Sequence, residues 1–147
     1  MIVDRVASSS SVAPKTRTPD LASPAIVTML KNRLAALNSA DAKAQSAYYT
    51  QDAVLNDVLS GSPSDPQPLV TGNEAIGRYN AGLVNTYTFR LESVPPIIQY
   101  GRTVLELAKV SGDPEPILLL VYRLAANGKI SYEWVLPAGK TAATPFG

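Results

Sequence analysis

Apolar residues recur at helical spacing after residue 20, where the first ordered element of the chain is expected. Their positions repeat every three or four residues, which is typical of one face of an amphipathic helix. Ser23 and Pro24 fit an N-cap followed by proline in the first turn, and Asn38 and Ser39 end the pattern. The sequence therefore predicts a helix that begins at Pro24. Its apolar stripe consists of Ile26, Met29, Leu30, Leu34 and Leu37.

Short polar and turn-forming segments divide the next fifty residues into short predicted elements. We expect a second helix over 41–49, a strand over 52–59 and a loop rich in Ser, Pro and Asp over 60–68. Thr71 and Glu74 have the spacing of a capping box, which predicts the start of a third helix. The apolar side of that helix is Ile76, Tyr79, Leu83 and Val84.

The second half of the chain changes to the two-residue period of strands. Alternation over 87–94 stops at Pro95 and Pro96, and further extended stretches are predicted over 97–100, 103–110 and 117–124. Asn127-Gly128 is a strong signal for a two-residue hairpin turn, with the chain returning over 129–136. Helices precede strands, so the fold class is α+β with the helices on one face of an antiparallel sheet.

Residues 1–20 lack any periodicity and contain four consecutive serines, so we predict a flexible N-terminal tail followed by one domain over 21–147. Alternatively, Ile2, Val3 and Val6 dock onto the body or onto a second copy. The length of 147 residues suits a single domain with a substantial core.

Composition removes several classes of chemistry. The chain has no Cys and no His, which excludes disulfides, thiolate nucleophiles, Ser-His-Asp triads and Cys/His zinc sites. Acid–base chemistry must come from Asp, Glu, Tyr, Lys or Arg, and we expect neither a metal nor an organic cofactor. A net charge of +1 argues against nucleic acid as a partner. No apolar run is long enough for a membrane span or a signal peptide, so we expect a cytoplasmic protein.

The order of elements resembles the nuclear transport factor two-like superfamily, which includes ketosteroid isomerases, SnoaL-like polyketide cyclases and limonene-epoxide hydrolases. The resemblance rests on five parts of the sequence. In chain order they are residues 34–38, Asp41, the Tyr-Tyr-Thr-Gln-Asp-Ala-Val segment over 48–54, the Gly-Asn-Glu-Ala-Ile-Gly-Arg-Tyr segment over 72–79, and Asn127-Gly-Lys-Ile130. The resemblance covers about residues 23–136 and implies a cone: a curved sheet wrapped round three helices, with a ligand pocket at its mouth, often in a homodimer. One fold hosts many functions, so it is a poor guide to chemistry.

Asp57 and Arg33 are the first two candidate site residues. Asp57 shares the apolar strand face of Ala53 and Leu55, and by the resemblance it matches the position of the isomerase-type base. Alternatively, it caps the following loop or pairs with an arginine. Arg33 falls within the apolar stripe of the first helix, where the resemblance places an oxyanion-hole tyrosine in isomerases. It either stabilises developing negative charge or forms a structural ion pair with Asp57 or Glu133.

The predicted hairpin supplies the other two candidate catalytic residues. With the turn at Asn127-Gly128, Tyr122 lies directly across from Glu133 on the apolar face of the hairpin. Leu120 stands where isomerases carry a second oxyanion donor, so that donor is lost. We expect the pocket to be lined by a further set of residues: Leu30, Leu55, Asn56, Tyr79, Leu118, Leu120 and Val135. Of the remaining polar groups, Glu106 is expected to pair with Arg123 or Arg102, and Tyr49 to lie in the core or at the rim.

These features favour a small-molecule acid–base enzyme of isomerase or cyclase type, acting on an apolar ketone-like or polyketide-like substrate. Asp57 would be the base, Arg33 and Tyr122 would stabilise charge, and Glu133 would be a second acid. The alternative is a non-catalytic ligand-binding or dimeric interaction module, with a homodimer forming through the outer sheet face of Arg123, Tyr132 and Trp134. An epoxide hydrolase would need a relay rebuilt from Asp57, Arg33 and Glu133, because Leu107 and Lys109 do not match its arginine and companion acid.

Overall fold

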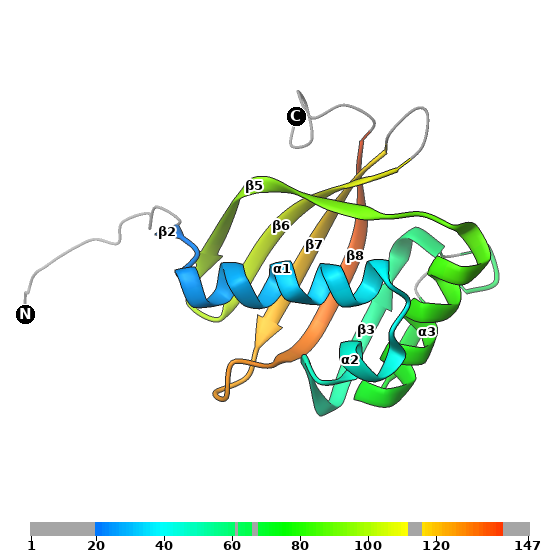
Figure 1. Ribbon diagram of the computed structural model, residues 1–147, viewed down its shortest axis with the longest axis horizontal. Helices are drawn as coiled ribbons and strands as arrows, with labels where there is room; N and C mark the ends of the chain where they lie inside the picture. The colour runs from blue at the N-terminus through cyan, green and yellow to red at the C-terminus, as the bar shows by residue number, and fades with distance from the viewer. Residues whose placement is uncertain (1–19, 61, 66–67, 112–115, 140–147) are drawn as a thin grey trace, which may run out of the picture.

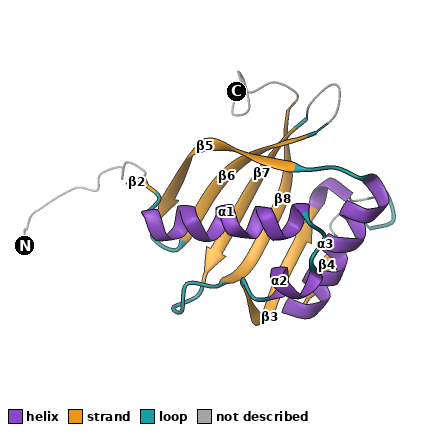
Figure 2. Ribbon diagram, viewed as in Figure 1, coloured by secondary structure: helices purple, strands orange, loops and turns teal. Residues whose placement is uncertain are grey.

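A single sheet with helices on one of its faces makes up the described part of the chain (Figures 1 and 2). The computed structural model describes residues 20–60, 62–65, 68–111 and 116–139. The predicted tail over 1–19 lies outside these residues. The predicted α+β cone is confirmed: three α-helices lie against a seven-stranded, mostly antiparallel sheet.

The three helices begin close to where the sequence predicts. Helix α1 spans Pro24–Asn38, and the Ser23 hydroxyl accepts a hydrogen bond from the Ile26 N–H as its N-cap. Helix α2 is shorter than predicted and spans Ala42–Ser46, capped by Asp41. Helix α3 spans Asn73–Tyr87. Its predicted capping box is wrong: Gly72 is the N-cap and no side chain caps it, because Thr71 belongs to a strand.

The sheet has the strand order β2-β5-β6-β7-β8-β3-β4. The strand bounds are β2 Asp20–Leu21, β3 Tyr49–Asp57, β4 Leu69–Thr71, β5 Leu91–Tyr100, β6 Thr103–Val110, β7 Ile117–Leu124 and β8 Ile130–Gly139. A short 3-10 turn, η1, covers Val58–Ser60. All neighbouring pairs are antiparallel except β3 and β8, which run parallel.

Several predicted strand boundaries in the middle of the chain are wrong. The strand predicted over 52–59 begins at Tyr49 and ends at Asp57, so Tyr49 belongs to the sheet and not to the second helix. The strand predicted from residue 87 begins at Leu91, because α3 continues to Tyr87. Pro95 and Pro96 do not end it: β5 runs through them, with a register shift against β6 between Val94 and Ile98.

The two sheet faces separate as the alternation predicts. The inward side of β7 and β8 is buried, including Leu120, Tyr122, Leu124 and Glu133. On the outer side, Arg123 is exposed and the rings of Tyr132 and Trp134 stack with their centroids 4.1 Å apart. The homodimer through this outer face stays a prediction.

Side chains at the C-terminal end and along the inward side of α1 fix it across the concave face of the sheet. At its C-terminal end, the Asn38 amide donates to the Leu91 carbonyl oxygen at 2.9 Å and accepts from the Leu91 N–H at 2.8 Å. On the inward side, Leu30 and Leu34 pack into the core with Leu55 and Leu120. This arrangement holds the middle of α1, including Arg33, against the inner faces of the strands. None of the described helices is both long and apolar enough to cross a membrane.

The close approach of α2 and α3 depends on the missing side chain of Gly77. A Cβ built there would lie 2.3 Å from the Ala42 carbonyl oxygen, whereas a Cβ at Gly82, also in α3, would meet nothing within 4 Å. We expect Gly77→Ala to destabilise the protein by about 1–3 kcal/mol, because backbone atoms must move. The matched change Gly82→Ala should stabilise it by about 0.5–1 kcal/mol through helix propensity. Urea unfolding of both variants measures the difference, and equal midpoints would contradict the proposed contact.

Candidate active site

A buried arginine lies at the centre of the candidate site. Arg33 is 1% exposed and sits on the inward face of α1 between Leu30 and Leu34, as the apolar stripe predicts. A charge removed from water needs partners that replace its hydration. Those partners come from four strands of the sheet, and all of them are tyrosines or glutamates.

The strand registers bring these partners into one region under α1. Tyr122 on β7 pairs with Glu133 on β8, which confirms this predicted pair, although the register shifts nearer the turn, between Arg123 and Leu124. Glu133 also lies beside Leu55 of β3, whose first residue is Tyr49. On the other side of β7, Glu106 of β6 pairs with Leu120, two residues before Tyr122. The inward faces of four consecutive strands therefore each supply one polar group beneath Arg33.

Hydrogen bonds join these side chains into what we call the Arg33 cluster: Arg33, Tyr49, Glu106, Tyr122 and Glu133. Arg33 Nη1 donates to the Tyr49 hydroxyl at 3.0 Å, and Nη2 donates to the Tyr122 hydroxyl at 2.7 Å. The Tyr49 hydroxyl in turn donates to Glu133 Oε1, and the Tyr122 hydroxyl donates to Glu106 Oε1 at 2.7 Å. Arg33 Nη2 lies 3.5 Å from Glu133 Oε2, which forms an ion pair. Each tyrosine thus links the guanidinium to a carboxylate.

Burial and charge shift the ionisation of the cluster in defined directions. Burial opposes the charge on Arg33, but Glu133 and the other partners outweigh it, so its pKa is raised and it stays positive. Burial also raises the pKa of Tyr49 and Tyr122, which keeps both hydroxyls protonated as donors. For Glu133, burial raises the pKa above 4.5, and Arg33 and the Tyr49 hydrogen bond only partly oppose the shift. Glu133 is therefore an acid whose proton affinity is increased by its surroundings.

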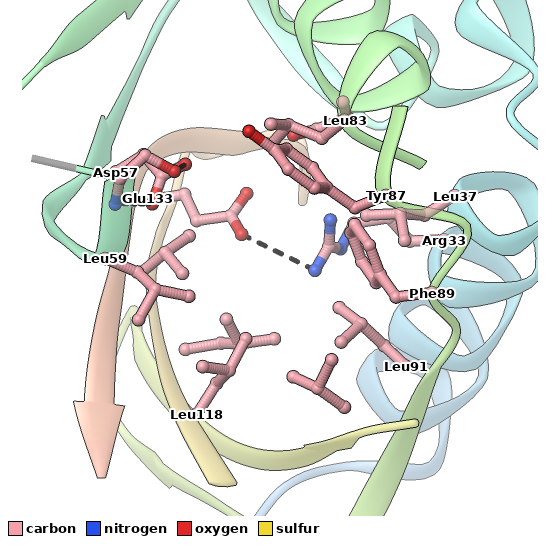
Figure 3. Close-up of a pocket in the computed structure, with 15 residues that line it drawn as sticks. Arg33, Leu37, Asp57, Leu59, Leu83, Tyr87, Phe89, Leu91, Leu118 and Glu133 are labelled. Atoms are coloured by element: carbon pink, nitrogen blue, oxygen red, sulfur yellow. Dashed lines mark hydrogen bonds and ion pairs between the residues drawn. The ribbon is translucent and has the colours of Figure 1, made fainter. Parts of the chain in front are cut away.

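The cluster forms part of the wall of an apolar cavity of about 410 Å³, here called the main cavity (Figure 3). On this wall the Glu133 carboxylate points toward the Arg33 guanidinium, and the ion pair joins them (Figure 3). Asp57 is on the same wall, on the strand next to Glu133. The rest of the lining is mostly apolar: Leu37, Leu59, Ser60, Asn80, Leu83, Tyr87, Phe89, Leu91, Val110, Leu118, Leu120 and Val135.

Asp57 has its own set of partners, separate from the Arg33 cluster. Its Oδ2 accepts from the Tyr79 hydroxyl at 2.7 Å and from the Ser60 hydroxyl at 2.8 Å, and its Oδ1 accepts from the Ser60 N–H at 3.2 Å. Asp57 thus caps the turn that follows its strand, the alternative that the sequence leaves open, and it also lines the main cavity. Burial raises the pKa of Tyr79 to about 12, so this phenol remains a donor to Asp57.

The predicted site residues fall into three groups. Arg33, Asp57 and Glu133 line the main cavity together with Leu118, Leu120 and Val135. Tyr122, Leu30 and Leu55 do not line the cavity. Tyr122 accepts a hydrogen bond from Arg33, and the two leucines pack in the core. Tyr79 contacts the cavity wall through Asp57, and Asn56 is buried between β4 and β8.

Several polar residues of the site are missing from the sequence-based set, among them Tyr49, Glu106 and Asn80. Tyr49 and Glu106 belong to the Arg33 cluster, and Asn80 of α3 lines the main cavity. The expected pairing of Glu106 with Arg123 or Arg102 is wrong, because Glu106 accepts from Tyr122 on the inward face. Tyr49 has the same strand parity as Ala53, Leu55 and Asp57, a signal that the correct start of β3 would have made visible. In the described residues, no group of three or more acidic side chains is placed to bind a metal ion.

Comparison with known proteins identifies the fold and not the chemistry. No protein-family model and no curated protein matches the sequence. Among solved structures, a SnoaL-like protein of unknown function from Burkholderia thailandensis matches with a TM-score of 0.68 and 14% identity, covering 80% of this chain and 99% of that one. A proposed polyketide cyclase from Sinorhizobium meliloti matches with a TM-score of 0.61 and 23% identity, covering 77% and 94%.

A third solved structure gives the same result. A proposed isomerase of the SnoaL-like family from Agrobacterium tumefaciens matches with a TM-score of 0.63 and 14% identity, covering 77% of this chain and 97% of that one. At these identities the likeness concerns the backbone, and the residues of the Arg33 cluster are read from this chain alone. The chain therefore has the α+β cone fold of the SnoaL-like and nuclear transport factor two-like proteins, as its sequence resemblance implies.

Proposed function

We propose that the protein is an acid–base enzyme of isomerase or cyclase type, acting on a small apolar carbonyl compound in the main cavity. The observation that supports this most directly is the pairing of Arg33 with Glu133 on the wall of a mostly apolar cavity. A positive group that is buried and already positioned stabilises negative charge far better than one in water. The names of the compared cyclase and isomerase agree with this class without adding evidence for it.

One N–H group of Arg33, at Nε, is available in this proposal to bind a substrate. Its two terminal nitrogens are used by Tyr49, Tyr122 and Glu133, whereas Nε has no hydrogen-bond partner among the described residues. A buried N–H without an acceptor is costly, so a substrate carbonyl oxygen there would recover a hydrogen bond. When a proton leaves the carbon next to that carbonyl, the developing enolate charge would lie beside the guanidinium.

Two carboxylates are available to move the proton. In this proposal, Asp57 accepts the proton from the substrate carbon, and Glu133, which enters the cycle protonated as its raised pKa favours, gives its proton to the product. Exchange with solvent then removes the proton from Asp57 and returns one to Glu133. They lie on the neighbouring strands β3 and β8, and the charge of Asp57 contributes to the raised pKa of Glu133. Tyr122 and Tyr49 act through their contacts: they orient Arg33 and Glu133.

A ligand-binding protein without catalysis is the second candidate. The specific observation in its favour is that both oxygens of Asp57 already accept hydrogen bonds from Ser60 or Tyr79. An acid so occupied is suited to holding the turn after β3, and the main cavity would then only bind its ligand. The two candidates differ in whether a bound ketone exchanges its protons.

Proton exchange at carbon tests the proposal before the natural substrate is known. We expect the protein to accelerate deuterium uptake next to the carbonyl in a panel of small cyclic ketones, followed by NMR in D₂O. Asp57→Asn and Glu133→Gln should each lower the rate about 10²–10⁴-fold, since each removes a proton-transfer group. Glu92→Gln is the matched control, because Glu92 is exposed on β5 and pairs with Lys109 on the neighbouring strand.

The outcomes separate the two candidates. Ketones that bind in the main cavity without any accelerated exchange would leave a ligand-binding protein. Accelerated exchange that both amide variants retain would exclude Asp57 and Glu133 as the proton-transfer groups.

The raised pKa of Glu133 also predicts a pH dependence of stability. A group that binds its proton more tightly when folded loses stabilisation as the pH rises from its unfolded pKa, near 4.5, through its folded pKa. The wild-type protein should therefore lose stability relative to Glu133→Gln as the pH rises above about 4.5. Urea unfolding of both proteins across this range measures the difference, in which the titrations of other groups cancel. A pH-independent difference would show that Glu133 has an ordinary pKa.

A further inference from the structure

A second cavity lies on the far side of the Arg33 cluster from the main cavity. It has a volume of about 450 Å³ and is formed where the start of α1 faces β2 and the middle of β5. Its walls are mostly apolar and share no residue with the main cavity. They consist of Leu21, Ala22, Val27, Lys31, Ser93, Pro95, Pro96, Ile97 and Glu106.

Glu106 is the one acidic group among these lining residues, and one of its two carboxylate oxygens accepts no hydrogen bond from the described residues. It is 1% exposed, and its Oε1 accepts from the Tyr122 hydroxyl. Its Oε2 is buried and has no hydrogen-bond partner among the described residues. A buried carboxylate oxygen without a donor costs more than an unmade hydrogen bond between neutral groups. The oxygen therefore favours any occupant of the second cavity that brings a donor.

The Arg33 cluster also contains more buried acidic groups than buried basic groups, which favours a ligand that brings a donor to Glu106. Glu106 and Glu133 are two buried acids that share a single buried guanidinium, and Arg33 makes its direct ion pair with Glu133. Glu106 is joined to Arg33 by hydrogen bonds through the Tyr122 hydroxyl. Lys31 lines the same cavity, but it lies on an exposed position of α1.

We propose that the second cavity is a binding site for a small apolar molecule that ends in a hydrogen-bond donor, a hydroxyl or an ammonium, which Glu106 Oε2 accepts. The apolar part contacts Val27, Pro96 and Ile97, and the donor replaces the missing partner of the carboxylate. This site is separate from the proposed chemistry of the main cavity and does not depend on it.

Three probes of similar shape test the preference for a donor: cyclohexylmethanol, cyclohexylmethylamine and cyclohexyl methyl ether. Binding is measured by calorimetry or ligand-observed NMR on the full chain. We expect the alcohol or the amine to bind at least about tenfold more tightly than the ether, which has no donor. The stronger of the two shows whether the site prefers a neutral or a charged donor. Equal binding of all three, or no binding, would overturn the proposal.

The substitution Glu106→Gln gives a sharper test, because it changes the wall from an acceptor to a donor. The Tyr122 hydroxyl accepts from Arg33 and needs an acceptor of its own, so the new amide oxygen should take the place of Oε1. The amide NH₂ then replaces Oε2 at the cavity. We expect this variant to bind the ether more tightly than the amine, the reverse of the wild-type order. A merely structural role for Glu106 would weaken all three probes alike, and an unchanged order would contradict the proposal.

Two further variants locate the binding and test the competing partner. Val27→Trp places a large ring at the rim of the second cavity and should abolish binding, whereas binding that survives would belong elsewhere. Lys31→Met should leave donor binding in place. If donors bind only after this change, Lys31 itself is the partner of Glu106 in solution, and the site is not a ligand site. Glu92→Gln on the exposed side of β5 serves as the matched control and should bind like the wild type.

Discussion

The burial of a single positive charge is the constraint on which the rest of this structure depends. Arg33 lies in the middle of an apolar helix face, and of the described residues it is the one buried cation. Removing either partner of such a buried pair typically costs about 3–5 kcal/mol, because the remaining charge stays buried without compensation. Tyr49, Tyr122 and Glu133 therefore have to meet Arg33 in the folded state, which fixes α1 against β3, β7 and β8.

The same cluster separates two cavities and gives each a different polar group. On one side, Arg33 and Glu133 line the main cavity, where we propose that a carbonyl compound binds. On the other, Glu106 faces a space that suits a donor. Tyr122 connects the two, since it accepts from Arg33 and donates to Glu106. A ligand that donates a hydrogen bond to Glu106 would therefore alter the acceptor of the Tyr122 hydroxyl, which also contacts Arg33.

Local sequence signals predicted much of this arrangement, and the failures have physical causes. The helical stripe placed Arg33 inward, and Asn127-Gly128 marked the hairpin that brings Tyr122 opposite Glu133. The turn itself differs from the predicted two-residue form: Ala125 N–H donates to the Lys129 carbonyl oxygen, and the register shifts between Arg123 and Leu124. Tyr49 was missed because the boundary between α2 and β3 has no strong breaker. The parallel pairing of β3 with β8 joins segments far apart in the chain, and no local pattern encodes it. Glu106 was assigned an arginine partner because its contact with Tyr122 depends on the register between β6 and β7, which no short turn motif specifies.

The central claim is that Arg33 is a buried donor with one N–H available to a ligand, and NMR of its Nε–H group tests this most directly. In the ligand-free protein, we expect a resolved arginine Nε–H resonance with slow exchange against water, since this nitrogen is buried and has no hydrogen-bond partner among the described residues. Adding a cyclic ketone that binds should shift this resonance, and adding the matching hydrocarbon should not. A resonance that exchanges freely with solvent, or that stays unchanged while the ketone occupies the main cavity, would contradict the account.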